Sequence, residues 1–125
     1  MQIPYHQGEP KIFLELQAKN GVWIGFIAYI DSGASYSVFQ PDIAKTLAID
    51  LKTGKKTKLT VGNGDKIVVY LHKINVKILN FAFSATIGFS PDLGIGTNLI
   101  GQKDFFEKFK ICFNSKDKFL EITKL

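Results

Sequence analysis

Apolar and polar residues alternate over the segment 11–17, which carries apolar side chains at Ile12, Leu14 and Leu16, and residues 22–30 are almost wholly apolar. Alternation with a period of two is typical of a strand with one buried face. Between the two segments, Asn20-Gly21 has the residues that tight hairpin turns prefer. The pattern therefore predicts a β-hairpin.

Further segments have the apolar, β-branched and aromatic content of short strands and are separated by turn residues. Residues 62–64, Gly-Asn-Gly, join two of them as a second hairpin, and Asn80 is expected to turn the chain between two others. Residues 88–96 are expected to form a loop. The apolar pattern of residues 1–10 is too interrupted to predict a regular strand there. The predicted strands cover residues 36–39, 57–61, 66–71, 74–79, 81–87, 110–113 and 119–123.

Two segments are expected to leave the strand pattern. Pro41 suits the first position of a helix, so a brief turn or helix is predicted up to Leu47. Asp104 opens an amphipathic segment in which Phe105 and Phe109 lie four residues apart, with lysines at its end, and we predict one short helix there. Together these elements indicate an all-β, small closed barrel rather than a parallel α/β sheet.

The chain has the size of a single domain, residues 1–125. With 125 residues and 46% hydrophobic content, it can bury roughly two-thirds of its unfolded surface. No apolar run reaches the ~18 residues of a membrane span. The N-terminal residues lack the apolar stretch of a signal peptide, because Pro4 interrupts them and they become polar by Gln7. We therefore expect a soluble, unexported, cytoplasmic protein with no membrane partner.

The charge of the chain is a second source of hypotheses about partners. All sixteen basic residues are lysine, and the net charge is +5. The densest cluster, residues 52–58, has no aromatic residue for stacking on bases and no arginine for bidentate contacts. We predict a solvated loop there and no nucleic-acid partner, and keep a lysine-rich nucleic-acid binder as a rival hypothesis.

Cysteine and histidine residues offer little further chemistry. Cys112, the single cysteine, stands between Ile111 and Phe113, so it is predicted to be a buried thiol with no internal disulfide. His6 and His72 have no second ligand at the spacing of a metal site. We expect neither a metal nor a cofactor.

The candidate chemistry lies in residues 29–34, Tyr-Ile-Asp-Ser-Gly-Ala, where an apolar segment runs directly into a carboxylate. An aspartate at the end of a buried strand is costly to desolvate unless hydrogen bonds or a second ionisable group stabilise its charge. Water-activated hydrolysis of an amide usually needs two carboxylates, one ionised and one protonated. One motif per chain implies that two chains meet at their Asp31 loops on a two-fold axis. The alternative is an Asx-type turn in which Asp31 only caps its own backbone.

Three motifs in this order resemble the retropepsin-like aspartic proteases, the single-domain family that includes the retroviral proteases. They are Asp-Ser-Gly-Ala at 31–34, the glycine-rich turn at 62–65, and Asn-Leu-Ile-Gly at 98–101 with the segment after it. The resemblance spans about residues 11–123. It implies the retropepsin fold, a homodimer with one Asp31 from each chain, and hydrolysis of peptides between large apolar residues.

The resemblance also assigns roles to the residues around Asp31. Ser32 would make a hydrogen bond across the dimer and fix the two loops, and Ala34 completes the motif. Because Gly33 has no side chain, it would let a substrate backbone approach closely. Residues 119–125 could serve as the strand that interlocks the two chains.

Flap and pocket residues follow from the same resemblance. Gly62, Asn63 and Gly64 would form the tip of a flap that closes over a bound peptide. The alternative for these residues is an ordinary surface hairpin. Leu99 would line an apolar pocket for a substrate side chain, or else pack in the core.

The sequence departs from the family pattern at two positions. Retroviral members carry an acidic residue and an arginine that form an ion pair bracing the dimer, and here the matching residues are Ser35 and Gln102. The spacing after Gly101 is also one residue longer than usual. We predict an aspartic endopeptidase. The alternative is a non-catalytic peptide-binding or assembly module that retains the fold.

Overall fold

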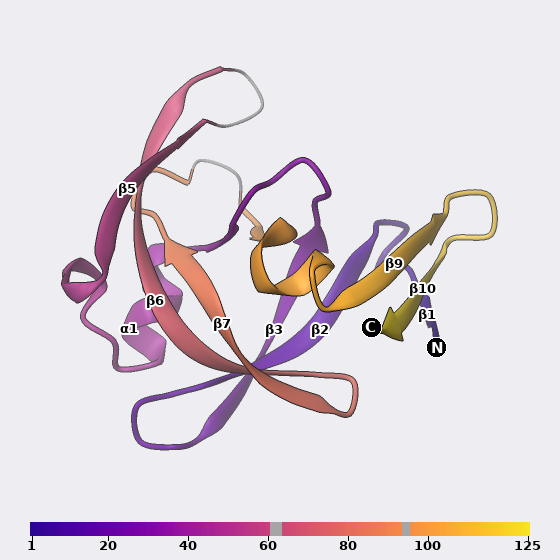
Figure 1. Cartoon of the computed structure of the whole chain (residues 1–125), viewed down its shortest axis with the longest axis horizontal. Helices are drawn as coiled ribbons and strands as arrows, with labels where there is room; N and C mark the ends of the chain where they lie inside the picture. The colour runs from indigo at the N-terminus through magenta and orange to yellow at the C-terminus, as the bar shows by residue number, and fades with distance from the viewer. Residues whose placement is uncertain (61–63, 94–95) are drawn as a thin grey trace.

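The computed structural model describes residues 1–60, 64–93 and 96–125, and in these residues the chain is built mainly of β-strands (Figure 1). Its helical elements are α1 (Pro41–Thr46), the 3₁₀ turn η1 (Leu51–Thr53) and the irregular turn η2 (Gln102–Phe106). The strands are β1 (Gln2–Pro4), β2 (Lys11–Gln17), β3 (Trp23–Ile30), β4 (Ser37–Phe39), β5 (Lys55–Thr60), β6 (Lys66–Ile78), β7 (Phe81–Phe89), β8 (Asn98–Ile100), β9 (Phe109–Asn114) and β10 (Phe119–Lys124).

A closed barrel forms the centre of the described structure. Its strands follow the order β2-β3-β8-β4-β7-β6, and β6 pairs again with β2 at Leu16 and Val76 to close the ring. Burial alternates along β2, where Ile12, Leu14 and Leu16 point into the core as the sequence predicts. The all-β closed-barrel prediction is therefore confirmed.

Two parallel pairings place the candidate site at one end of this barrel. β3 pairs in parallel with β8, and β4 pairs in parallel with β7. β8 also contacts β4 at Leu99 and Val38, so it lies between the ends of β3 and β4. The loop that begins at Asp31 therefore leaves the barrel beside the end of β8.

The hairpin of β5 and β6 stands at the edge of this barrel. β6 runs without a break from Lys66 to Ile78, so the two strands predicted at 66–71 and 74–79 are one. Antiparallel pairing with β7 continues through His72 and Lys73, which lie opposite Ile87 and Thr86, and this is why the polar pair does not end the strand. β7 likewise continues to Phe89, so the predicted loop at 88–96 begins later, at Ser90.

The predicted helix after Asp104 is wrong. Asp104 has a φ of 67° and Lys103 a ψ of 122°, neither of which is helical. The amides of Gln102 and Lys103 donate to the carbonyls of Ala34 and Ser35, at 2.8 and 2.9 Å. These bonds hold residues 102 and 103 against the Asp31 loop, and the chain turns at Asp104 with a left-handed φ where a helix would need a right-handed one.

The phenylalanine pair that suggested this helix is nevertheless buried. Phe105 and Phe109 both pack against Phe83 of β7, with ring centroids 5.5 Å apart in each case. Phe109 already belongs to β9, so a turn followed by a strand buries the same two rings that a helix would have buried.

A separate three-stranded sheet lies at the other side of the molecule from the β5–β6 hairpin (Figure 1), with the order β1-β10-β9. Residues 2–4 form a strand here, contrary to prediction, because β10 supplies its pairing partners from the far end of the sequence. Cys112 on β9 is exposed, so the prediction of a buried thiol is also wrong. No helix in the described residues is long and apolar enough to cross a membrane.

Candidate active site

Asp31 follows the last residue of β3 and is fixed by its backbone. Its amide donates to the carbonyl of Ile100 on β8 at 2.9 Å, and its own carbonyl accepts from the amide of Ala34 at 3.2 Å. The carboxylate oxygen Oδ1 accepts a 2.9 Å hydrogen bond from the amide of Gly33. The side chain thus forms the local Asx-type turn that the sequence left as an alternative.

This turn uses only one carboxylate oxygen. Within the described part of the chain, Oδ2 of Asp31 has no hydrogen-bond partner, and the side chain is only partly buried. The Asx turn therefore orients the carboxylate and leaves one oxygen for a water, a substrate or a second carboxyl group. Capping and catalysis are compatible roles for this residue.

The next three residues form a tight loop around the carboxylate. Ser32 and Gly33 are exposed, and Ala34 is partly buried. A β-carbon at Gly33 would lie 3.3 Å from Oδ1 of Asp31, closer than about nine in ten real contacts of that kind. A glycine at this position therefore keeps the approach to the carboxylate open.

Gln102 braces this loop from the other side. Its side-chain amide donates a 2.7 Å hydrogen bond to the carbonyl of Ser32. In the sequence resemblance, Gln102 and Ser35 are the residues matched to the arginine and the acid of the retroviral ion pair. A neutral hydrogen bond within one chain thus holds the loop here.

Gly101 makes this close packing possible. A β-carbon at Gly101 would lie 2.5 Å from the carbonyl oxygen of Tyr36 and 2.6 Å from that of Ala34. The amide of Gly101 donates a 3.0 Å hydrogen bond to the hydroxyl oxygen of Ser37, which is fully buried. Only glycine lets β8 pass so near the Asp31 loop.

Sequence reasoning missed two buried polar residues that support this arrangement. One is Ser37, and the other is Asn98, whose side-chain oxygen accepts from the amide of Gln40 at 3.0 Å while its NH₂ group donates to the carbonyl of Ile27 at 3.1 Å. Both stand within short apolar strands. A polar side chain in such a strand needs a partner, and that signal could have identified them.

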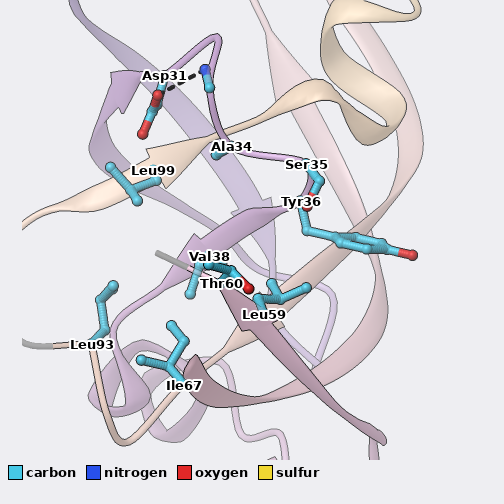
Figure 2. A pocket seen from close by; sticks show the side chains of 11 residues that line it. Asp31, Ala34, Ser35, Tyr36, Val38, Leu59, Thr60, Ile67, Leu93 and Leu99 are labelled. Atoms are coloured by element: carbon cyan, nitrogen blue, oxygen red, sulfur yellow. Dashed lines mark hydrogen bonds between the residues drawn. The ribbon is translucent and has the colours of Figure 1, made fainter. Parts of the chain in front are cut away.

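A cavity of about 180 Å³ opens beside Asp31. Figure 2 shows apolar side chains gathered below the carboxylate, from β8, β4 and the β5–β6 hairpin. Leu99 lines it, and the other apolar side chains are those of Val38, Leu59, Ile67 and Leu93. The cavity combines one carboxylate with an apolar wall.

The β5–β6 hairpin provides one side of this cavity through Leu59, Thr60 and Ile67. Of the predicted flap tip, Gly62 and Asn63 lie outside the described residues. Gly64 has a φ of 88°, which favours glycine, and it does not line the cavity. The hairpin therefore borders the same cavity as Asp31, and its role as a flap stays a prediction.

Asp31 also lines a second, wider cavity of about 490 Å³. Its other lining residues include Ser32 of the same loop and Tyr5, Phe113 and Lys118. Asp31 therefore lies between an apolar pocket under the hairpin and a broad hollow beside the β1-β10-β9 sheet. In the described residues, no group of three or more histidine, cysteine or acidic side chains could hold a metal ion.

Comparison with known proteins identifies the fold of the chain. No family model and no curated protein matches the sequence. Among solved structures, a retropepsin-like aspartic protease from Rickettsia conorii is similar, with a TM-score of 0.67 and 23% identity, covering 98% of this chain and 97% of that one. EIAV protease, solved with the inhibitor HBY-793, has a TM-score of 0.55 and 15% identity, covering 75% of this chain and 82% of that one. The chain therefore has the fold of the retropepsin-like aspartic proteases.

Proposed function

We propose that this protein is an aspartic endopeptidase whose active site forms when two copies of the chain bring their Asp31 carboxylates together. The observation that supports it best is the free oxygen of Asp31, held by the Asx turn at the edge of an apolar cavity. The likeness to a retropepsin-like aspartic protease over nearly the whole chain supports the same reading.

The proposed hydrolysis uses two carboxyl groups that lie next to each other. Like charges at hydrogen-bonding distance cannot both ionise, so the pair would share one proton. The ionised member would take a proton from a water molecule, while the protonated member donates to the carbonyl oxygen of the peptide. The water oxygen would then bond to the carbonyl carbon, and the carbon–nitrogen bond breaks as the nitrogen is protonated.

The substrate would be an extended peptide between the hairpin and the barrel. Main-chain hydrogen bonds would hold it, and alternate side chains would enter pockets. The apolar wall formed by Leu99, Val38 and Ile67 favours a large apolar side chain next to the scissile bond. We therefore expect cleavage between apolar residues.

The test is cleavage of a library of extended peptides by the wild-type chain and by Asp31→Asn. Asp31→Asn keeps an acceptor for the amide of Gly33 but removes the acid and base, so activity should fall at least ~100-fold. Asp42→Asn is the matched control, because Asp42 is an exposed residue of α1 outside the cavity. It should retain activity within about twofold, since exposed positions of this kind change little.

Wild-type activity in Asp31→Asn would overturn the proposal. If the wild-type chain instead binds apolar peptides without cleaving any of them, the non-catalytic peptide-binding module is the better description. A peptide analogue carrying a hydroxyl group in place of the scissile amide should inhibit the wild-type enzyme, because it resembles the tetrahedral transition state.

A further inference from the structure

The β1-β10-β9 sheet restricts how a second copy could dock. β10 pairs with β9 from Phe119 to Lys124 and with β1 from Phe119 to Glu121. The C-terminal strand, which the sequence suggested as the interlocking strand, therefore has both edges occupied over its first half, and only its last residues extend beyond β1. A second chain that extends this sheet must add to β1 or to β9.

The outer edge of β1 is a poor template. The carbonyl of Met1 accepts from the amide of Ile122, and the amide of Tyr5 donates to the carbonyl of Lys118, so the odd-numbered residues face β10. Gln2 and Pro4 then face outward. Pro4 has no amide hydrogen, and a proline on an edge strand blocks further pairing.

The outer edge of β9 has the opposite character. The amide of Ile122 points to β1, so Glu121 points to β9, where it pairs with Cys112. By alternation, the backbone groups of Ile111 and Phe113 face away from β10. In the described chain no strand pairs with that edge, and the Phe113 side chain is 40% exposed.

This edge also lies close to the catalytic loop. The 490 Å³ cavity is lined by Asp31 and Ser32 and also by Phe113. Because the loop and the strand share one cavity, a two-fold axis that passes beside Asp31 can also pass beside the β9 edge. A partner chain would fill the hollow that one copy leaves open.

We propose that β9 is the strand that joins two copies of this chain, by antiparallel pairing with β9 of the partner around the two-fold axis. This inference rests on the proposed function, because it is the need for two Asp31 residues that calls for a second copy. The two sheets would become one continuous six-stranded sheet, β1-β10-β9 followed by its symmetry mate.

The side chains of β9 select the register of this pairing. With Cys112 opposite the partner subunit's Cys112, Ile111 lies opposite the partner subunit's Phe113, a favourable β-branched and aromatic pair. Lys110 then lies opposite the partner subunit's Asn114, so no like charges meet. The outward backbone groups of Ile111 and Phe113 form the interchain hydrogen bonds, and Cys112 occupies the closely spaced, non-hydrogen-bonded position.

One test is sedimentation equilibrium of the full chain. Phe113→Asp introduces a charge beside the axis and should raise the dimer dissociation constant roughly tenfold or more, equivalent to about 1.4 kcal/mol. Phe13→Asp is the matched control, because Phe13 on β2 is 58% exposed and does not border the wide cavity. It should change the dissociation constant by less than about twofold.

The native thiol gives a second, independent readout. Cys112 is the only cysteine of the chain, so any disulfide-linked dimer joins Cys112 to Cys112. Diamide, which takes up the two thiol hydrogens, should link the wild-type dimer quickly and Phe113→Asp slowly, because Cα atoms at such a position lie within disulfide range. Should Phe113→Asp fail to fold by circular dichroism, linking of the wild-type chain above and below its dissociation constant decides the question.

Dimerisation that is unchanged in Phe113→Asp, with no rapid linking through Cys112, would overturn the β9 interface. A monomeric wild-type chain at all concentrations would overturn it too. The proposed function fails separately: a β9-dependent dimer whose Asp31→Asn variant still cleaves peptides would leave the interface standing and remove the enzyme mechanism.

Discussion

Asp104 holds a position that few residues can occupy. Its φ of 67° lies in the left-handed region, and its Oδ2 accepts a 2.7 Å hydrogen bond from the amide of Thr86 on β7. Asp104→Ala would leave that amide without its partner and place an ordinary side chain in a strained backbone. We expect the free energy of unfolding to fall by about 1–3 kcal/mol. Asp104→Asn should lose less, because asparagine keeps an acceptor and tolerates this conformation. Urea unfolding at pH 7 measures both.

The charge of Asp104 adds a pH dependence to the same comparison. Partial burial raises the pKa of Asp104, but the hydrogen bond from Thr86 and the nearby Lys108, Lys103 and Lys73 outweigh it and hold the pKa below its usual 3.8. A carboxyl group with a lowered folded-state pKa stabilises the protein above its unfolded pKa and loses this contribution as pH falls through the folded value. The difference in unfolding free energy between wild type and Asp104→Asn should therefore shrink below about pH 4. A constant difference from pH 7 to pH 3 would contradict the assigned role of the charge.

Among the secondary-structure elements, β8 and the loop after β3 depend on close contact at Gly101. In Gly101→Ala, the new β-carbon would meet two backbone oxygens at 2.5 and 2.6 Å, and backbone atoms cannot move aside as a flexible side chain can. The Asp31 loop must shift, so we expect the free energy of unfolding to fall by about 1–3 kcal/mol, together with a loss of peptide cleavage. Gly96→Ala is the control, since a β-carbon there meets no atom of the described residues within 4 Å. Equal stability and activity of the two variants would show that the loop does not need this contact.

Elements with a regular pattern could be predicted from the sequence. The alternation in β2 and the turn at Asn20-Gly21 define the first hairpin, because both signals are local. The Asp31 loop was found for a similar reason: a carboxylate directly after a buried strand requires an explanation from its neighbours alone.

Elements that depend on distant partners could not be predicted. η2 has the phenylalanine spacing of a helix, but its amides bind a loop some seventy residues earlier in the chain. β1 forms because β10 lies beside it, and no local pattern shows that. Cys112 has apolar neighbours, yet alternation along β9 places its side chain on the face opposite to theirs. Buried Ser37 and Asn98 likewise find their partners only in the folded chain.

Mixing an inactive variant with the wild-type chain tests whether each active site needs two chains. If Asp31 acts as a pair, an Asp31→Asn chain will capture wild-type chains in inactive heterodimers. With equal amounts of both and random exchange, about half of the wild-type chains have a mutant partner, so activity per wild-type chain should fall to about half. Cleavage of an apolar peptide after re-equilibration at concentrations above the dimer dissociation constant measures this. The double variant Asp31→Asn, Phe113→Asp should inhibit less than the single variant, because a chain with weakened pairing through β9 captures fewer partners. Equal inhibition by the single and the double variant would retain the shared active site and place the interface on another surface.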